Sequence, residues 1–445
     1  MKLLQLTFAL PLACLMAHGA TDPHETMHYR LQVRVEPAAH TLVADAWIQH
    51  PAESRFYLYK GFAVRQVDAD GKAAQFKLDA SAPQLQYLPG AVAVSVAAPD
   101  AKELHIQYGG EFSDVVAGVN MISPELVELA LYSAWYPVFS GFKECTFEAE
   151  IDLPDGFLTA TNGQQIADRE HEGRRITEWR SFKLGMDIVL LASPRLHRIE
   201  GGTAGTHVEI DYYQLSPKWM QSKIDGLVAG MDKLSARYGA PRIGGGLRIV
   251  YSPRGGWGYS RIPLIVVSEE RARGVLSGPN GEANDFRDNA HEMAHFWWTI
   301  SDPATPNDWI NEGLAEFSAF RLTEDRFGRP FADARLAEYR QNAGRSKTTA
   351  SIAETSTDSP DREINRYDKA TLMLLEAQRR FGAEPLDRLL KELHTRYAGT
   401  LHATTADFLA EAGKQMGAEA ETYFSSELYR KAVVAGANDG VEKTQ

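Results

Sequence analysis

The sequence contains little cysteine, no long run of basic residues and, after residue 20, no apolar run long enough to span a membrane. Cys14 and Cys145 are the only cysteines among 445 residues, so stability must come from packing rather than from a set of disulfides. The formal net charge of −12 and the lack of basic runs argue against nucleic acid as a partner. The hydrophobic content of 44% predicts substantial cores in two or three domains.

Residues 1–20 have the pattern of a bacterial secretory signal, with an apolar run from Leu3 to Met16 and small residues at the end. We therefore expect an exported protein, periplasmic or extracellular. A second interpretation is lipoprotein anchoring through Cys14, because the residues before it partly resemble a lipobox, although Pro11 argues against it. If the segment is removed, Cys145 is the only cysteine left and no intrachain disulfide can form.

Alternation of polar and apolar residues dominates residues 21–204, which we predict to form an all-β domain. From Met27 to Val35 every second residue is apolar, as a strand with one buried face requires. Further strands are predicted at Leu42–Ile48, Arg55–Tyr59, Ala91–Val96, Leu104–Tyr108, Thr146–Leu153 and Ile188–Ala192. The glycine-rich stretch Gly201–Gly205 predicts the boundary to a second domain, residues 205–445.

The second domain combines a few strands with many helices. A helix is predicted at Pro217–Tyr238, and strands at Leu247–Tyr251 and Leu264–Val267. From Asp285 onward the pattern is mostly helical, and the polar interval Arg345–Arg362 is expected to be a mobile loop near a cleft. Helices are expected around residues 291 and 312 and at Ala332–Gln341, Lys369–Phe381, Leu386–Tyr397 and Thr405–Met416.

The segment His291-Glu292-Met293-Ala294-His295 has the spacing of a zinc site with its own base. Residues four apart share one face of a helix, so His291 and His295 can present two imidazoles to one ion. Glu292 beside that ion can take a proton from a metal-bound water and pass it to a leaving amine. The alternative is a chance match on a solvated helix face, but the surrounding residues are apolar and a carboxylate pair follows.

A second helix supplies that carboxylate pair. Apolar residues recur at helical spacing from Ile310 to Phe317, which leaves Glu312 and Glu316 together on another face. We predict Glu312 as the third ligand of one zinc ion per chain, with the fourth position open for water. Glu316 is predicted to accept the spare ring N–H of a ligating histidine and so to fix its tautomer.

These residues resemble the gluzincins, and among them the aminopeptidase N and leukotriene hydrolase family, in the two-domain form without a C-terminal helical domain. His291, Glu292 and His295 match the family's HExxH, and Asn311-Glu312-Gly313 matches its downstream NEG motif. The resemblance implies a multi-domain α+β fold, in which an N-terminal all-β domain precedes a thermolysin-like zinc metallopeptidase catalytic domain. It also implies zinc as the cofactor and peptides as substrates.

The segment Arg366–Ala370 is similar to the family's Tyr-x-Lys-Gly segment, with Ala370 in place of the glycine. The resemblance implies that Tyr367 stabilises the transition state by donating a hydrogen bond to the oxyanion. Without it, Tyr367 would be interpreted as a half-buried packing residue.

One departure from the family concerns the substrate's free amine. The family's Gly-x-Met-Glu-Asn strand has its nearest counterpart at Gly255-Gly256-Trp257-Gly258-Tyr259, which makes Gly255, Gly256 and Trp257 the predicted substrate-binding residues. Gly258 replaces the glutamate that would hold the amine.

A glutamine of the family's N-terminal domain usually assists that glutamate, and Leu126 stands in its place here. Glu125 or Glu128 is the candidate replacement. The sequence thus predicts an aminopeptidase-type metallopeptidase with altered amine anchoring. The alternatives are an endopeptidase of the same fold and an inactive peptide-binding relative, although no ligand, base or tyrosine has been lost.

Overall fold

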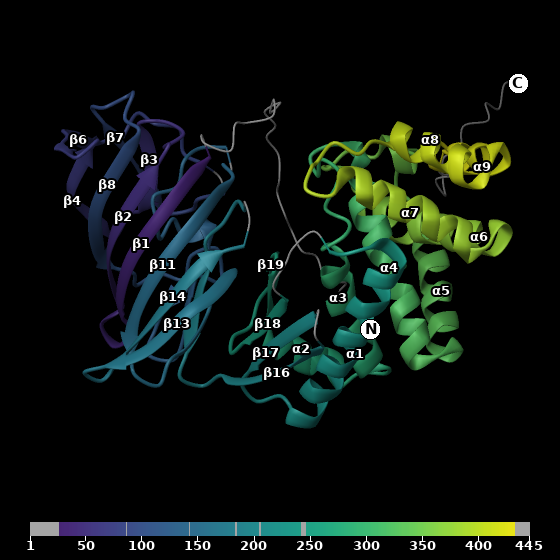
Figure 1. The fold of residues 1–445 in the computed structure, drawn as a ribbon, viewed down its shortest axis with the longest axis horizontal. Coiled ribbons are helices and arrows are strands. Elements are labelled where there is room, and N and C mark those ends of the chain that lie inside the picture. The colour runs from purple at the N-terminus through teal and green to yellow at the C-terminus, as the bar shows by residue number, and fades with distance from the viewer. Residues whose placement is uncertain are drawn as a thin grey trace, which may run out of the picture.

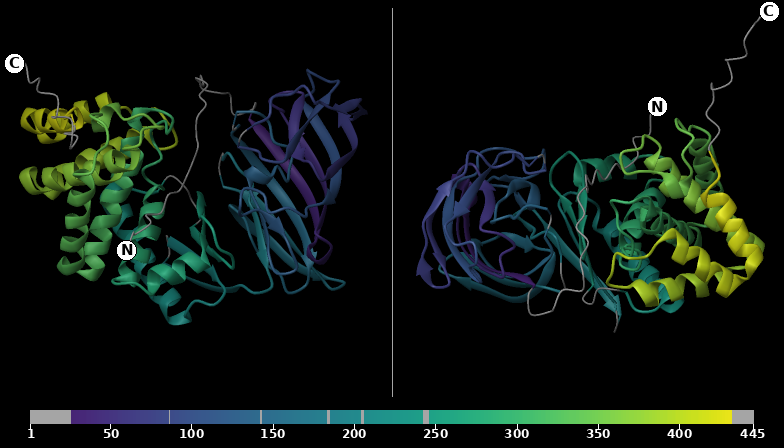
Figure 2. Two further views of the ribbon diagram at one scale, coloured as in Figure 1. Left: turned by 180° about the vertical axis from the view of Figure 1, so that it is seen from behind. Right: turned by 90° about the horizontal axis from the view of Figure 1, so that it is seen from above.

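The computed structural model describes residues 26–431 except residues 86, 142, 183–184, 204–205 and 242–245. The predicted signal segment and Cys14 lie outside the described residues. As predicted, a β-rich N-terminal domain precedes a second domain that is mostly helical (Figures 1 and 2). None of the helices in the described part of the chain has both the length and the apolar character needed to cross a bilayer.

The N-terminal domain is built from three β-sheets. Its strands are β1 (Met27–Glu36), β2 (Thr41–Gln49), β3 (Arg55–Tyr59), β4 (Phe62–Ala69), β5 (Lys72–Ala73), β6 (Phe76–Leu78), β7 (Ala91–Val96), β8 (Glu103–Glu111), β9 (Met121–Ile122), β10 (Val127–Leu129), β11 (Cys145–Pro154), β12 (Leu158–Ala160), β13 (Gly163–His171), β14 (Arg174–Ser181) and β15 (Leu190–Ser193). The largest sheet has the order β13-β14-β11-β1-β2-β8-β4-β5, and the smaller sheets have the orders β12-β15-β10-β9 and β3-β7-β6.

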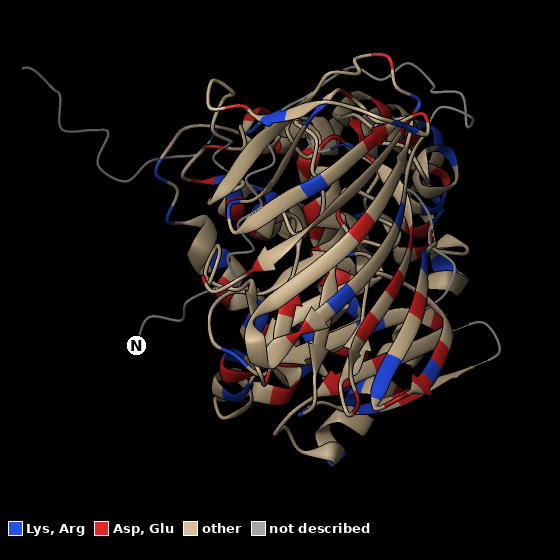
Figure 3. Cartoon of the chain, turned by 90° about the vertical axis from the view of Figure 1, so that its left-hand side faces the viewer, with Lys and Arg blue, Asp and Glu red and all other residues tan. Residues whose placement is uncertain are grey.

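Strand β1 lies near the middle of the largest sheet, parallel to β11 and antiparallel to β2. Its predicted alternation is observed, because Tyr29, Leu31 and Val33 are buried and the residues between them are exposed. Charges of both signs are interspersed over the outer face of this part of the molecule (Figure 3). Strands β13 and β14 are missing from the predicted set, since their many charged residues hide the alternation.

The second domain contains one five-stranded sheet and a group of helices. The strands are β16 (His197–Thr203), β17 (Thr206–Tyr212), β18 (Leu247–Ser252), β19 (Tyr259–Arg261) and β20 (Leu264–Ser268), in the order β16-β17-β18-β20-β19. The helices are α1 (Pro217–Tyr238), α2 (Glu269–Leu276), α3 (Gly281–Ala294), α4 (Trp309–Phe327), α5 (Arg329–Ala343), α6 (Ala370–Phe381), α7 (Ala383–Tyr397), α8 (Thr405–Met416) and α9 (Ala418–Leu428), with a π-helix η6 (Ile364–Lys369) and short 3-10 helices η4 (Pro306–Asp308) and η5 (Ile352–Glu354).

The central strands of this five-stranded sheet are buried on both faces. Ile249 and Tyr251 of β18 belong to the core formed with the helices. Val250, between them, belongs instead to a core shared with Leu126 and Tyr132 of the N-terminal domain. The sheet therefore joins the two domains, lying between the β-rich part and the helices (Figure 1).

The structure differs from two sequence expectations. β16 and β17, on either side of residues 204–205, pair with each other, so the expected domain boundary at Gly201–Gly205 falls inside the five-stranded sheet. The chain passes from the sheets of the N-terminal domain to this sheet before His197. The interval Arg345–Arg362, expected to be a mobile loop, contains the short helix η5, and Asp361 links its end back to its start. This buried carboxylate accepts hydrogen bonds from the backbone N–H of Lys347 at 2.8 Å and of Thr348 at 2.6 Å.

Candidate active site

Helices α3 and α4 pack side by side and bring the two predicted histidines and Glu312 together. His291 lies in the last turn of α3, and His295 is the residue that caps its C-terminus. The Nε2 atoms of His291 and His295 lie 3.3 and 3.5 Å from the same atom, Oε2 of Glu312. These three side chains therefore converge from two helices on a single point.

The geometry of this group fits a tetrahedral metal ion. Ligand atoms about 2.1 Å from such an ion would lie about 3.4 Å apart, close to the separations observed here. Apart from these two imidazoles, the buried Glu312 Oε2 has no hydrogen-bond partner among the described residues, and a cation at the point of convergence would satisfy it. Two imidazoles and one carboxylate are a donor set suited to zinc.

A second group of three potential ligands, Glu200, His207 and Glu209, lies on the hairpin of β16 and β17. Its carboxylate Glu209 is already bound by cations, since Arg198 lies 3.1 Å away and Arg248 also pairs with it. This group is therefore the weaker candidate for a metal.

Glu316, one turn beyond Glu312, lies against the other nitrogen of His291. Its Oε2 is 2.9 Å from His291 Nδ1, as the predicted orienting role requires. Its other oxygen accepts hydrogen bonds from Arg287 and Tyr339, with Arg335 at 3.5 Å. Burial alone would raise the pKa of Glu316, but Arg287 and His291 hold it well below its usual range, so the carboxylate stays charged.

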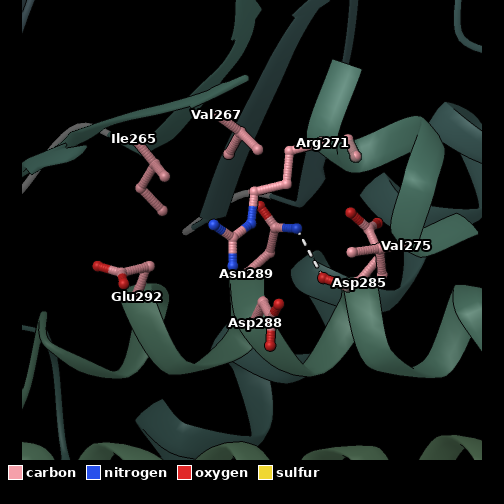
Figure 4. A pocket seen from close by; sticks show the side chains of 9 residues that line it. Ile265, Val267, Arg271, Val275, Asp285, Asp288, Asn289 and Glu292 are labelled. Atoms are coloured by element: carbon pink, nitrogen blue, oxygen red, sulfur yellow. Dashed lines mark hydrogen bonds between the residues drawn. The ribbon is translucent and has the colours of Figure 1, made fainter. Parts of the chain in front are cut away.

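Glu292, which follows His291 on α3, is one of the residues that line a pocket. It is 7% exposed, and burial raises the pKa of its carboxyl although His295 and His291 oppose the shift. The pocket is formed by α3, α2 and β20 (Figure 4). Glu292 thus lies close enough to His291, His295 and Glu312 to interact with their charges, and it also lines this pocket.

Tyr367 reaches the site from the π-helix η6. Its ring stacks on that of His291, with centroids 5.4 Å apart and an angle of 15° between the planes. Burial and the nearby Glu312 carboxylate raise the pKa of the half-buried phenol, so it keeps the proton it would donate. π-helical turns often occur at functional sites, but hydrophobic periodicity gives no signal for one.

The residues beside Glu312 hold its helix in place. The side-chain oxygen of Asn311 accepts hydrogen bonds from the backbone N–H of Ile300 and Ser301, both at 3.0 Å, which ties α4 to the chain leaving α3. Gly313 lets α4 approach η6 and the start of α6 closely, because a Cβ there would lie 3.1 Å from the carbonyl oxygen of Arg366 and 2.7 Å from the Cβ of Ala370. The NEG motif therefore fixes both the ligand and its contact with the helix that carries Tyr367.

The predicted substrate-binding residues Gly255, Gly256 and Trp257 lie in the loop before β19 rather than on a strand. Trp257 packs against the N-terminal domain, where its Nε1 donates to the carbonyl of Ala117 at 3.1 Å and its ring contacts Tyr132. The edge strand itself begins only at β19, so the predicted strand at residues 255–259 is displaced toward the C-terminus. A role in substrate binding for these three residues stays a prediction.

Neither proposed replacement for the amine anchor is a free carboxylate. Glu128 is fully buried; its Oε2 accepts from Arg254 Nε at 2.8 Å and from Ser252 Oγ at 2.6 Å. Glu125 forms an ion pair with Arg195 at the surface. A peptide ammonium would have to displace an arginine to reach either of them.

Comparison with known proteins gives structural matches. No family model matches the sequence, and no curated protein matches it. An M1 zinc metallopeptidase from Deinococcus radiodurans superposes with a TM-score of 0.66 at 17% identity, over 93% of this chain and 97% of that one. A mutant of an M1 zinc metallopeptidase from Deinococcus radiodurans bound to a Tyr-Ser-Ala substrate gives 0.68 at 16% identity, over 92% and 95%. Yeast LTA4 hydrolase gives 0.62 at 15% identity, over 93% of this chain and 69% of that one.

The chain has the fold of the two-domain M1 zinc metallopeptidases. The fold of both domains therefore agrees with the family resemblance that the sequence motifs indicated.

Several supporting residues gave no sequence signal. Arg287, Arg335 and Tyr339 surround Glu316, and Asp308 pairs with the buried Arg366 beneath Tyr367. Each pair joins residues far apart in sequence or on different helices, so spacing alone does not reveal it. Among these residues only Arg366 lies in a segment that the motifs had selected.

Proposed function

We propose that this chain is an exported zinc metallopeptidase that hydrolyses peptide bonds, with His291, His295 and Glu312 holding one zinc ion. The observation that carries the proposal is the convergence of two imidazoles on the buried, otherwise unpartnered Glu312 Oε2. A solvated helix face would leave these groups in water, and a purely structural cluster would satisfy that oxygen with a donor.

The proposed mechanism assigns one task to each side chain. Zinc, when bound, supplies a Lewis acid that lowers the pKa of water and polarises a carbonyl. Glu292 takes the proton of the attacking water and delivers it to the leaving nitrogen. Tyr367 donates a hydrogen bond to the oxygen on which negative charge develops. Glu316 keeps His291 in the tautomer that leaves Nε2 free to bind.

We further propose an aminopeptidase-type activity with altered amine anchoring. A Deinococcus radiodurans M1 enzyme is bound to the peptide Tyr-Ser-Ala, which supports peptides as the substrate class. Gly258 and Leu126 carry no charge, and the Glu128 carboxylate is already paired with Arg254. A free N-terminal ammonium therefore gains little binding free energy from these positions. Internal peptide bonds, and peptides with a blocked N-terminus, become substrates as well.

The test compares peptides of one sequence with free and with acetylated N-termini, incubated with the purified protein and analysed by mass spectrometry. We expect both series to be cleaved at rates within about tenfold of each other. A preference on the order of a hundredfold for the free peptides, with residues removed one at a time, would show that another acid anchors the amine.

A further inference from the structure

The pocket beside Glu292 is lined by one face of α3 and by parts of β20 and α2 (Figure 4). Asp285, Asp288, Asn289 and Glu292 recur at helical spacing and form its floor. Ile265 and Val267 of β20 form an apolar wall. Arg271, from α2, extends over this space toward the side on which Glu292 lies (Figure 4).

The charged groups of this pocket are unequally paired. Asp285 forms an ion pair with the buried Lys223, and Asp288 forms one with Arg287. Arg271 interacts with the charge of Asp288, but its guanidinium makes no hydrogen bond or ion pair with any residue in the described part of the chain. The two aspartates thus have cations of their own, while Arg271 has no anion of its own.

A second polar group in the pocket also lacks a partner. The side-chain nitrogen of the buried Asn289 donates to the carbonyl of Asp285 at 2.7 Å and to the hydroxyl of Tyr251 at 3.2 Å. Its oxygen, Oδ1, is buried and accepts no hydrogen bond within the described structure. Native proteins rarely leave such an acceptor unsatisfied, so a donor from a bound molecule is expected there.

We propose that this pocket binds a carboxylate of the substrate on the leaving-group side of the scissile bond, with Arg271 as the specificity-determining residue. This inference rests on the proposed peptidase function. The side is set by Glu292: to deliver a proton, its carboxylate must lie within hydrogen-bond reach of the leaving nitrogen. The residue that carries that nitrogen therefore enters the pocket that Glu292 borders.

The carboxylate can come from two sources, an acidic side chain or the C-terminus of a substrate that ends one residue after the cleaved bond. Both offer the planar pair of oxygens that a guanidinium binds with two hydrogen bonds. In both cases Asn289 Oδ1 would accept a hydrogen bond from a backbone N–H of the bound peptide.

The experiment uses three peptides that differ only after the cleaved bond: glutamate with an amidated C-terminus, glutamine with an amidated C-terminus, and glutamine as a free C-terminal residue. For the parent protein we expect at least one carboxylate-bearing peptide to exceed the amidated glutamine peptide in kcat/KM by on the order of ten- to a hundredfold. The peptide that gains identifies the source of the carboxylate.

Four variants then assign the preference to Arg271. Arg271→Gln should abolish it, and Arg271→Lys should retain part of it. Arg271→Glu, tested also with a fourth peptide that has lysine after the cleaved bond, should favour the lysine peptide. Arg273→Gln is the matched control, because Arg273 is exposed on the same helix and its side chain bonds only to Gln214 among the described residues. Thermal unfolding of each variant shows whether a loss of activity is a loss of fold.

Two failures have different meanings. If the parent cleaves all three peptides equally well, or if Arg271→Gln keeps the full preference, the inference about the pocket is wrong while the peptidase function stands. If the parent binds no zinc and cleaves none of the peptides, the proposed function itself fails.

Discussion

The hydroxyl of Tyr367 is a group at the site whose removal changes no charge and little volume. Because its proposed hydrogen bond forms mainly in the transition state, Tyr367→Phe should lower kcat by on the order of a hundredfold and leave KM nearly unchanged. Steady-state kinetics on a single peptide measures both constants. A phenylalanine variant as active as the parent would make the stacking on His291 a packing contact only.

Glu316 acts through His291 rather than on the substrate. Glu316→Gln keeps the shape but weakens the acceptor for His291 Nδ1, so we expect zinc affinity to fall by about 10- to 100-fold. Competition with a chromophoric chelator measures that affinity. Tyr339→Phe, which removes one donor to Glu316 and leaves its charge, is the control and should have the smaller effect; equal zinc affinity in Glu316→Gln and the parent would contradict the role.

Spacing within one helix explains why the central residues were predictable. His291, Glu292 and His295 are placed by covalent geometry once the helix forms, and Glu312 and Glu316 by that of the next helix. The pairing of Glu128 with Arg254 joins residues 126 positions apart and depends on how two domains meet. No local pattern carries that information, so the pairing of Glu128 with Arg254 emerged only from the structure.

At the scale of elements, the contact between α4 and η6 brings Glu312 and Tyr367 into one site. A Cβ added at Gly313 would lie 2.7 Å from Ala370 Cβ and 3.1 Å from the carbonyl of Arg366. Gly313→Ala should therefore reduce the free energy of unfolding by about 1–3 kcal/mol and lower kcat, because η6 must shift.

Two further variants make that prediction specific. Gly274→Ala in α2 is the matched control, since a Cβ there would contact nothing within 4 Å; it should be neutral or stabilising by up to about 1 kcal/mol. Combining Gly313→Ala with Ala370→Gly should restore part of the loss, as expected for residues in contact. Denaturant unfolding and steady-state kinetics are measured for all variants. If the stability losses of Gly313→Ala and Ala370→Gly simply add in the double variant, their contact is not the cause of the loss in Gly313→Ala.

Elements with a one-sided apolar pattern were predictable, and those without one were not. β1 alternates cleanly, and α1 follows its predicted bounds, Pro217–Tyr238, because proline and glycine mark its ends. The short α2 has charged residues in its first turn and only three buried positions, Glu269, Ala272 and Leu276, so too few apolar residues mark it as a helix. Since α2 carries Arg271, the pocket beside Glu292 could not be inferred from sequence.

At the scale of the whole molecule, the two domains share a buried ion pair between Glu128 and Arg254. Arg254→Ala would leave the Glu128 carboxylate buried without a cation, which should cost about 3–5 kcal/mol of stability. Arg195→Ala breaks the exposed pair with Glu125 and should cost under about 1 kcal/mol. Chemical denaturation distinguishes the two; equal effects would mean that the buried pair does not stabilise the domain junction.

We propose a zinc ion held by residues of α3 and α4 with Glu292 beside it. Zinc content and peptide hydrolysis, measured on the same Glu292→Gln sample, separate metal binding from catalysis. We expect about one zinc ion per chain, as in the parent, with turnover lower by several orders of magnitude. Near-normal hydrolysis by a fully metallated Glu292→Gln protein would contradict it.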